Sequence, residues 1–505
     1  MQVFHSSFRP FSATPVLLVA LILSLASPCS ADTYVFEETV ETAVPEASGK
    51  AAPVAAQMPN NPIERNGAGA RPASPRKSER YKWQAPEKST LQVKTGTNAM
   101  ELVRKNSTTI YDFPRREIYN IENGKHQYES RSLFALVAYR NDELLNRFML
   151  GKIMSSAQFK KLSDSENPFD KFYSEAMLGV SNPKYSSNYK AALRKLADRD
   201  IYEYNGQTVT AVKDSTTALS REQALQFNRF LANTSMIHPA IRRQLAIRAK
   251  VPQELSWYVE NAPVSKTRVT LKLIKYSPDN YKISLGDLRE ASSNSRLLTP
   301  LYLKLKEKGY KRPADSQETS VSKFKQFVQK KNYLDAWLTV TEYGLETGEH
   351  QIYLLQSISK QIQADVDSQK LAKGCRAPAN EAEARASLAA LDSIERKKYE
   401  KAYLIDIFRA NLIKDLAEQG VEKINTTGEK KPEVAFVSAL TANPFITAAY
   451  YDLGDYLRTL FKHSEAWECY KIARKLQSGH PFQKTQDETE EKLVRDHPEF
   501  FTGAN

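Results

Sequence analysis

Apolar positions along the middle of the chain follow both the helical period and the strand period. The segment from Ser132 to Met154 repeats its apolar residues at close to 3.6 positions, which predicts a helix with one core-facing stripe. Residues 267–276 (TRVTLKLIKY) instead alternate apolar and polar positions, as a half-buried strand does. The pair Asn205-Gly206 separates two β-prone runs and suits the positive φ angles of a tight hairpin turn. We therefore expect an α+β domain over residues 91–315, with helices and a few strands.

Two further helices in this domain begin at residues that satisfy free backbone donors. Ser220 followed by Gln223 is a capping-box arrangement, and the helix behind it should run to about Asn233. His238 and Pro239 open a short basic helix over residues 240–251, because proline fits the first helical turn.

The strand pattern disappears after about Ser316. Long segments with helical spacing replace it, above all Glu381 to Gln419, where large apolar residues recur every three or four positions. We therefore expect residues 316–505 to form an all-α domain.

The first 31 residues have the three parts of a secretory signal peptide. Arg9 is the only charged residue before an unbroken apolar run from Val16 to Ala26, and small residues at 29–31 allow cleavage after Ala31. The apolar run is too short for a membrane helix, which needs about 20 residues. Residues 32–90 are expected to be a disordered linker, because most of this stretch is rich in Ala, Pro, Gly, Ser and charge.

The composition limits the class of protein further. The chain has 505 residues, of which 41% are hydrophobic and 26% charged, and this excludes wholly disordered, collagen-like and polytopic membrane proteins. Lys and Arg number 72 against 59 Asp and Glu, a formal charge of +13. Beyond the signal peptide the cysteines are Cys375 and Cys469, which we expect to be separate thiols, with one disulfide between them as the alternative.

Residues 447–480 carry the most specific motif of the sequence. They place Tyr450, Leu453 and Gly454 in one predicted helix and Ala466, Tyr470 and Ala473 in the next. This pattern of large, small and aromatic positions resembles a tetratricopeptide repeat (TPR), a unit of two antiparallel helices in about 34 residues. Leu457 departs from the family pattern, since an aromatic residue is usual there, and Pro481 comes three residues late. A weaker second copy is indicated by Phe327, Ala336, Val340 and Tyr343.

The resemblance also implies a binding face. In this family ligand peptides lie along the first helices of the repeats, and the matching positions here are Ala448, Tyr451, Asp455 and Arg458. The alternative is that these four residues contact the middle domain of the same chain.

Motifs of common enzymes are absent from the sequence. There is no Gly-x-Ser-x-Gly, no phosphate-binding Gly-x4-Gly-Lys-Ser/Thr loop and no zinc-peptidase His pair on one helical face. The seven histidines are dispersed, so we expect no metal and no cofactor. Arg242, Arg243, Arg248 and Lys250 are the best candidates for an anion contact, although Arg242 and Arg243 point about 100 degrees apart on a helix.

Together these features predict an exported, periplasmic or extracellular protein that acts as an interaction or scaffold module through TPR-like helices. Its expected partner is a protein or peptide, with weak contact to an anionic envelope surface as a further possibility and nucleic acid excluded. The alternatives are an exported enzyme with its site in residues 91–315, or a binder of an anionic envelope polymer.

Overall fold

The computed structural model describes residues 31–45, 81–153, 176, 192–204, 207–261, 265–279, 285, 288–290, 295–312, 316–376, 378, 380–418 and 431–502. The predicted signal peptide, apart from Ala31, lies outside the described residues, as do residues 46–80 of the predicted linker. The first half of the described chain forms a large, mainly antiparallel sheet with a few helices, and the second half is helical. We call them the sheet half and the helical half, and together they confirm the α+β class.

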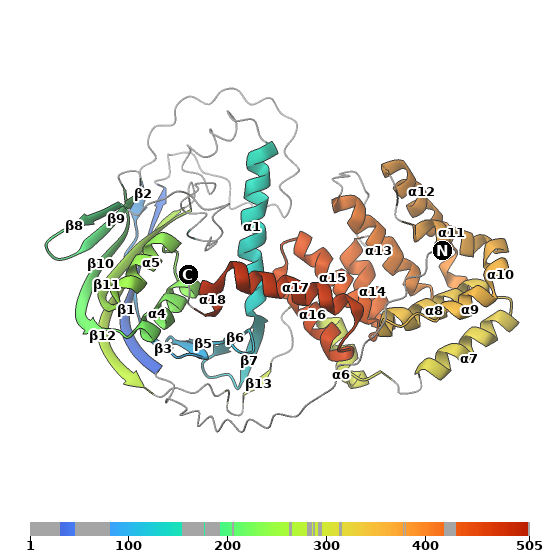
Figure 1. The fold of residues 1–505 in the computed structure, drawn as a ribbon, viewed down its shortest axis with the longest axis horizontal. Coiled ribbons are helices and arrows are strands. Elements are labelled where there is room, and N and C mark those ends of the chain that lie inside the picture. Colours follow the sequence, from blue (N-terminus) through green and yellow to red (C-terminus); the bar gives the residue numbers. More distant parts are fainter. Residues whose placement is uncertain are drawn as a thin grey trace, which may run out of the picture.

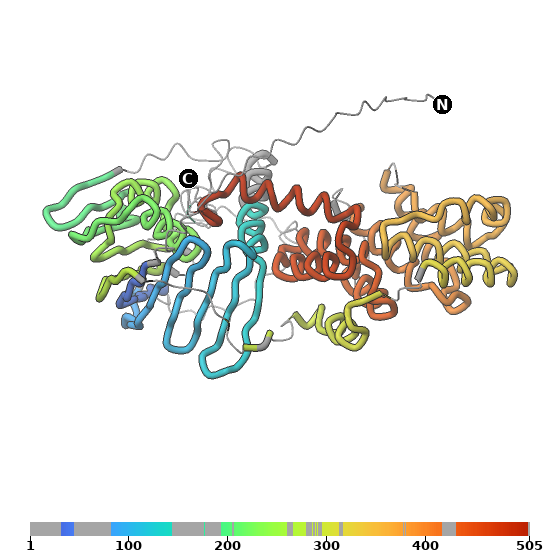
Figure 2. Tube along the Cα trace, turned by 60° about the horizontal axis from the view of Figure 1, so that its bottom comes forward, coloured from blue at the N-terminus to red at the C-terminus, as the bar shows by residue number. Residues whose placement is uncertain are grey.

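One sheet of 13 strands organises the sheet half. Its strands are β1 (Ala31–Pro45), β2 (Tyr81–Trp83), β3 (Glu87–Thr95), β4 (Ala99–Val103), β5 (Ser107–Asp112), β6 (Glu117–Glu122), β7 (Gln127–Ser132), β8 (Ala192–Lys195), β9 (Asp200–Tyr204), β10 (Gln207–Ala218), β11 (Lys250–Asn261), β12 (Ser265–Asp279) and β13 (Arg289–Glu290). Their order is β13-β7-β6-β5-β4-β3-β1-β12-β11-β10-β9-β8, with β2 paired to β1. Two antiparallel meanders, β3–β7 and β8–β12, are thus joined through β1, as the tube in Figure 2 lets the reader follow.

The prediction of a disordered linker is wrong where β1, β2 and the start of β3 lie. Tyr34 and Phe36 alternate with outward-facing residues and are at most 1% exposed, so β1 does bury an apolar face. Three of its glutamates pair with cationic side chains: Glu37 with Lys88 on β3, Glu38 with Arg104 just after β4, and Glu41 with Arg268 on β12. The composition of the segment therefore does not reveal this strand, because the residues that pair with its charges lie far away in the sequence.

Most of the predicted local elements of the sheet half are present. The helices are α1 (Leu133–Ile153), α4 (Arg221–Thr234) and α5 (Pro239–Arg248). Ser220 and Gln223 form the predicted capping box, and β9 pairs with β10 around the predicted hairpin turn, with Tyr204 opposite Gln207. The strand predicted over residues 267–276 lies within β12. α4 and α5 lie in the curve of the sheet (Figure 1).

The helical half consists of helices only, as far as it is described. These are α6 (Thr299–Lys308), α7 (Ser316–Gln329), α8 (Tyr333–Thr347), α9 (Ile352–Ser357), α10 (Ser359–Ala364), α11 (Val366–Gly374), α12 (Glu381–Asp392), the 3-10 turn η1 (Arg396–Lys398), α13 (Tyr403–Glu418), α14 (Pro432–Ala442), α15 (Thr447–Thr459), α16 (His463–Leu476), α17 (Pro481–Asp496) and α18 (Pro498–Phe501). No helix of the described residues has both the length and the apolar content that crossing a membrane requires.

The helical segment predicted from Glu381 to Gln419 is divided into α12 and α13. Between them, the backbone N–H groups of Glu400 and Lys401 each donate to the carboxylate of Asp335, at 3.1 Å. Asp335 is fully buried, so these hydrogen bonds replace water that its carboxylate lost on folding. A partner distant in sequence thus holds these residues outside a helix.

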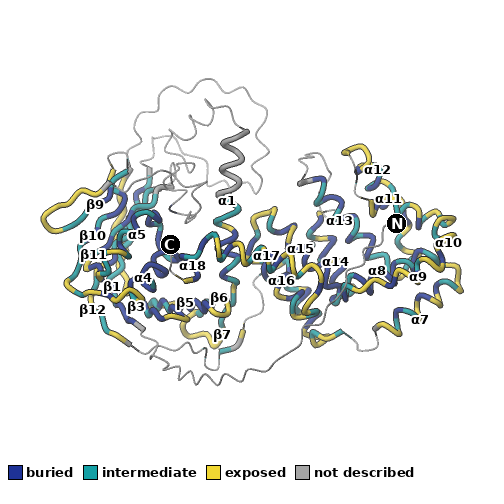
Figure 3. Tube along the Cα trace, viewed as in Figure 1, coloured by how far each residue is buried: buried dark blue, intermediate teal, exposed yellow. Residues whose placement is uncertain are grey.

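The C-terminal helices join the two halves. α17 runs back from the helical half, and α18 lies beside α4 on the inner side of the sheet (Figure 1). Phe500 and Phe501 are at most 1% exposed, and their carbonyl oxygens accept hydrogen bonds from Asn233 and Arg229 at 3.2 and 3.1 Å. One continuous hydrophobic core therefore extends through both halves, and Figure 3 shows its buried residues along the chain.

Candidate functional site

The predicted hairpin of residues 447–480 is present as α15 and α16. A Cβ atom added at Gly454 would lie 2.4 Å from the ring of Tyr470, so only glycine lets this ring pack against α15. The Tyr470 hydroxyl donates to Asp455 at 2.6 Å and so fixes the ring. The small and aromatic positions of the motif thus have the close-packing role that the resemblance implies, while membership of the family stays a prediction.

The four residues of the predicted binding face are occupied by contacts within the chain. Ala448 and Tyr451 are 1% and 3% exposed, and the Tyr451 ring stacks on His480, just before α17. Asp455 accepts from Tyr470, and Arg458 donates to Asp142 on α1 at 3.0 Å. The alternative, contact with the middle domain of the same chain, is thus seen for Arg458, whereas Tyr451 and Asp455 contact residues of the helical half.

Asp142 connects α1 with this hairpin. Its carboxylate bonds Nε2 of His463 and Nη2 of Arg458, each at 3.0 Å. Burial acts to raise the pKa of Asp142, but the hydrogen bond from His463 and the Arg458 charge outweigh it, so the pKa lies below its ordinary value. Asp142 is therefore ionised at neutral pH.

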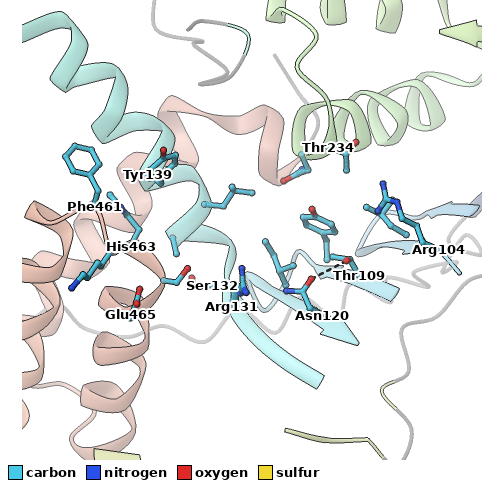
Figure 4. A pocket seen from close by; sticks show the side chains of 18 residues that line it. Arg104, Thr109, Asn120, Arg131, Ser132, Tyr139, Thr234, Phe461, His463 and Glu465 are labelled. Carbon is cyan, nitrogen blue, oxygen red and sulfur yellow. Dashed lines mark hydrogen bonds between the residues drawn. The ribbon is translucent and has the colours of Figure 1, made fainter. Parts of the chain in front are cut away.

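A pocket of about 590 Å³ opens beside this connection, and we call it the junction pocket (Figure 4). Strands β4–β7, helix α1, the end of α4 and the turn between α15 and α16 line it. The side chains used below are Arg104, Thr109, Asn120, Arg131, Tyr139, Asn233, Phe461, Lys462, His463 and Glu465. Because both halves contribute, the pocket exists only in the assembled fold.

Two aromatic rings form one wall of the junction pocket. Tyr139 and Phe461 are 40% and 38% exposed, and their rings are nearly perpendicular with centroids 6.5 Å apart. Phe461 has a φ of 58°, the left-handed region, which costs a non-glycine residue about 1 kcal/mol. Hydrogen bonds from Phe461 and Lys462 N–H to carbonyl groups at the end of α15, each 2.9 Å, stabilise this turn. The turn thus presents a large apolar ring to solvent.

The opposite side of the junction pocket is polar and positive. Asn120 accepts from Thr109 at 3.2 Å on the sheet, and Oδ1 of Asn233 is buried without a hydrogen-bond partner. Arg131, whose side chain is 54% exposed, supplies the available positive charge on this side, because Arg104 is paired with Glu38; Lys462 and Glu465 lie beside Phe461 on the other side. Such a wall favours a ligand that carries negative charge and hydrogen-bond donors.

No local motif marks these residues in the sequence, because they lie on separate elements that only the tertiary fold brings together. An exposed aromatic residue in the short turn before a predicted helix, such as Phe461, is the nearest available signal.

Of the four basic residues predicted as an anion contact, Arg243 and Lys250 are exposed, whereas Arg242 and Arg248 are engaged within the fold. Arg242 is 1% exposed and donates to the Ile237 carbonyl at 3.1 Å, while Arg248 pairs with Asp200 at 2.6 Å and with Asp214. These two arginines therefore serve the fold.

Among the described residues no group of three or more His, Cys, Asp or Glu is placed to hold a metal ion, and Cys375 and Cys469 are free thiols.

No family model matches the chain, and no curated protein matches it. The fold and the junction pocket are therefore what a proposal of function can rest on.

Proposed function

We propose that this is an exported interaction protein that binds an acidic peptide segment of a partner protein in the junction pocket. The TPR-like hairpin serves as one wall of that pocket, and its own face is used to hold the two halves together. The observation that carries the proposal is the meeting of exposed Tyr139 and Phe461 with a positively charged polar wall, built jointly by both halves.

The chemistry of the pocket favours a peptide with apolar and acidic side chains. Exposed aromatic rings and arginines are the residues that dominate binding energy at protein interfaces. Arg131 has 54% of its side chain exposed and a distant ion-pair partner, Glu129 at 3.7 Å, so a ligand carboxylate can compete for it. An apolar ligand side chain would pack on Tyr139 and Phe461 while an acidic one pairs with Arg131.

The proposal includes export, which is supported by the signal-peptide pattern of residues 1–31. The first strand begins at Ala31, so cleavage there leaves the β1 pairs from Asp32 onward in place. N-terminal sequencing of the protein recovered outside the cytosol should begin at Asp32. Recovery of the intact chain from the cytosol would contradict export.

Site-specific photo-crosslinking tests the proposed binding function. A crosslinking amino acid replacing Tyr139 should capture one defined protein species, and the same replacement at Tyr353, 61% exposed on α9, should not. The charge reversal Arg131→Glu should abolish the capture, whereas Arg385→Glu on α12 should leave it unchanged.

Two results would contradict the proposal. Equal capture at Tyr139 and Tyr353 would show that the junction pocket is not a specific site. Retention on an anionic matrix that falls steeply with salt, without any captured protein, would instead favour the binder of an anionic polymer.

A further inference from the structure

The helical half contains a second cavity, which shares no lining residue with the junction pocket. Its volume is about 400 Å³, and it lies among α7, α8, the start of α13 and the end of α14. Its charged residues are Arg312, Lys323, Lys401, Glu342 and Glu346. We call it the helical cavity.

One carboxylate of the helical cavity is fully engaged. Glu342 accepts hydrogen bonds from Lys401, from the Tyr403 hydroxyl and from the side-chain amide of Asn443. Its side chain is 10% exposed and that of Lys401 is 14% exposed, so the two opposite charges compensate each other away from water. Glu342 and Lys401 therefore form the fixed part of the cavity.

The second carboxylate, Glu346, lies one helical turn further along α8. It accepts a hydrogen bond from the Asn443 amide at 2.8 Å, and Arg312 lies 4.0 Å away, beyond hydrogen-bond distance. Burial, followed by the negative charge of Glu342, raises the pKa of Glu346 to about 7, against the weaker effects of Asn443, Arg312 and Lys401. Near neutral pH this group therefore carries a proton about half of the time.

Two polar groups of the helical cavity form no hydrogen bond within the described part of the chain. Nη1 of Arg312 and Oγ of Ser320 are buried and form no hydrogen bond, and Ser320 as a whole is 7% exposed. Buried polar groups are normally paired, so unpaired ones that line a cavity indicate a missing partner. Since arginine only donates and serine can donate, that partner is an acceptor of hydrogen bonds.

We propose that the helical cavity binds a small monocarboxylate, whose carboxylate group accepts hydrogen bonds from Arg312 and from Ser320 and lies beside the side chain of Glu346. The positive charge of Arg312 and Lys323 favours an anion. The two glutamates nearby favour a single negative charge over the double charge of phosphate, because repulsion grows with ligand charge. Tyr343 and Phe445 line the same space and accommodate an apolar ligand body.

Calorimetric titration of the full chain tests this site with four probes. These are benzoate, hexanoate and their uncharged amides, benzamide and hexanamide. At least one carboxylate should bind, and its amide should bind about tenfold or more weakly, because a hydrogen bond between two charged groups is lost. Inorganic phosphate should bind more weakly than that carboxylate.

The pH dependence follows from Glu346. Affinity should be highest below about pH 7 and should fall as the pH rises above it, because binding then requires proton uptake by Glu346. The charged groups that face Glu346 are Glu342, Arg312 and Lys401. Glu346→Gln keeps a donor at this position without titrating, so its affinity should be independent of pH there.

Three variants test which residues contact the carboxylate ligand. Arg312→Gln should abolish binding and Ser320→Ala should weaken it about fivefold, as expected for one lost hydrogen bond. Arg385→Gln, on the surface of α12, is the matched control and should bind as the unmodified chain does. Thermal unfolding of each variant separates loss of binding from loss of folding.

Two results would overturn the proposal. One is that neither carboxylate binds more tightly than its amide to the folded chain. The other is that binding persists in folded Arg312→Gln. Neither result bears on the junction pocket, so the proposed function and this site fail or stand independently.

Discussion

Two helical hairpins of similar length show how surroundings determine the role of a repeat-like unit. The outer hairpin, α7–α8, buries Phe324, Phe327 and Val340 in a small separate cluster, and only α8 reaches the main core, through Leu334 and Leu338. The inner hairpin, α15–α16, belongs to the main core and is covered by α1 and α17. Figure 3 shows exposed positions along α7 and mostly buried ones along α15. A hairpin motif therefore predicts a packing geometry, while availability of its face depends on the elements that cover it.

The largest effect is expected at α18, where the C-terminal segment that follows the inner hairpin packs on the sheet half. Phe500→Ala should lower the free energy of unfolding by about 3–5 kcal/mol, because it leaves a cavity in the core. Chemical denaturation measures this change. Phe482→Ala on α17 removes the same ring from a site that is 44% exposed and should cost under about 1.5 kcal/mol. Equal costs would show that the C-terminal segment does not hold the halves together.

Glu499, next to that ring, should make the connection sensitive to pH. Burial raises its pKa to about 7 despite Arg242 and Arg140, whereas an unfolded glutamate titrates at about 4.3. The folded chain thus binds a proton that the unfolded chain has lost, and this contribution to stability disappears as the pH rises from about 4.3 to 7.

Glu499→Gln removes this dependence. Relative to the unmodified chain, the variant should gain roughly 2–4 kcal/mol between about pH 4.5 and 7.5. Denaturation of both proteins over this range measures the difference, and a constant difference would contradict the assignment to Glu499.

Alanine at one glycine of each hairpin compares their packing directly. Gly454→Ala in α15 forces the new Cβ against the buried Tyr470 ring and should destabilise by about 1–3 kcal/mol. Gly344→Ala in α8 meets Nδ1 of exposed His350 at 2.9 Å, a side chain that can move away. This second change should be neutral or stabilise by up to about 1 kcal/mol, because alanine favours the helix. Thermal unfolding measures both changes in stability. If they are similar, the two hairpins do not differ in how tightly they are packed at these glycines.

The smallest effect should come from the ion pair between the inner hairpin and α1. Asp142→Asn removes the charge that Arg458 and His463 face and should cost about 1–2 kcal/mol at pH 7. Since the pKa of Asp142 is lowered in the fold, its contribution is present above about pH 4 and disappears as the pH falls further. Glu381→Gln breaks the exposed Glu381–Arg385 pair and should cost at most about 0.5 kcal/mol. If Asp142→Asn costs no more stability than this control, the contacts of Asp142 with Arg458 and His463 do not help to hold the inner hairpin to α1.

Elements with local signals could be predicted from the sequence. The capping box at Ser220, the pairing of β9 with β10 and the close packing at Gly454 each depend on residues near one another in the chain. The size of the sheet was underestimated because strands such as β5 and β7 are six residues long and mostly polar. Their stability comes from pairing with distant partners, which no local pattern reports.

The candidate sites could be predicted from the sequence even less well than the sheet, because tertiary structure brings their residues together. The motif placed Tyr451 and Arg458 on the correct helix, but the cover provided by α17 and Asp142 has no signature near either residue. The junction pocket combines Arg131 at the end of a strand, Tyr139 on a helix and Phe461 more than 300 positions later. Only the folded arrangement makes them neighbours.

The central place of β1 has a consequence for biosynthesis. Ala31 pairs with Asp279, so this strand leaves the ribosome long before half of its bonding partners exist. Until translation has passed Asp279, β1 and the meander β3–β7 lack the partner strand β12 and can associate wrongly with other chains. Chaperone protection during synthesis therefore matters most for the stretch made between these two residues.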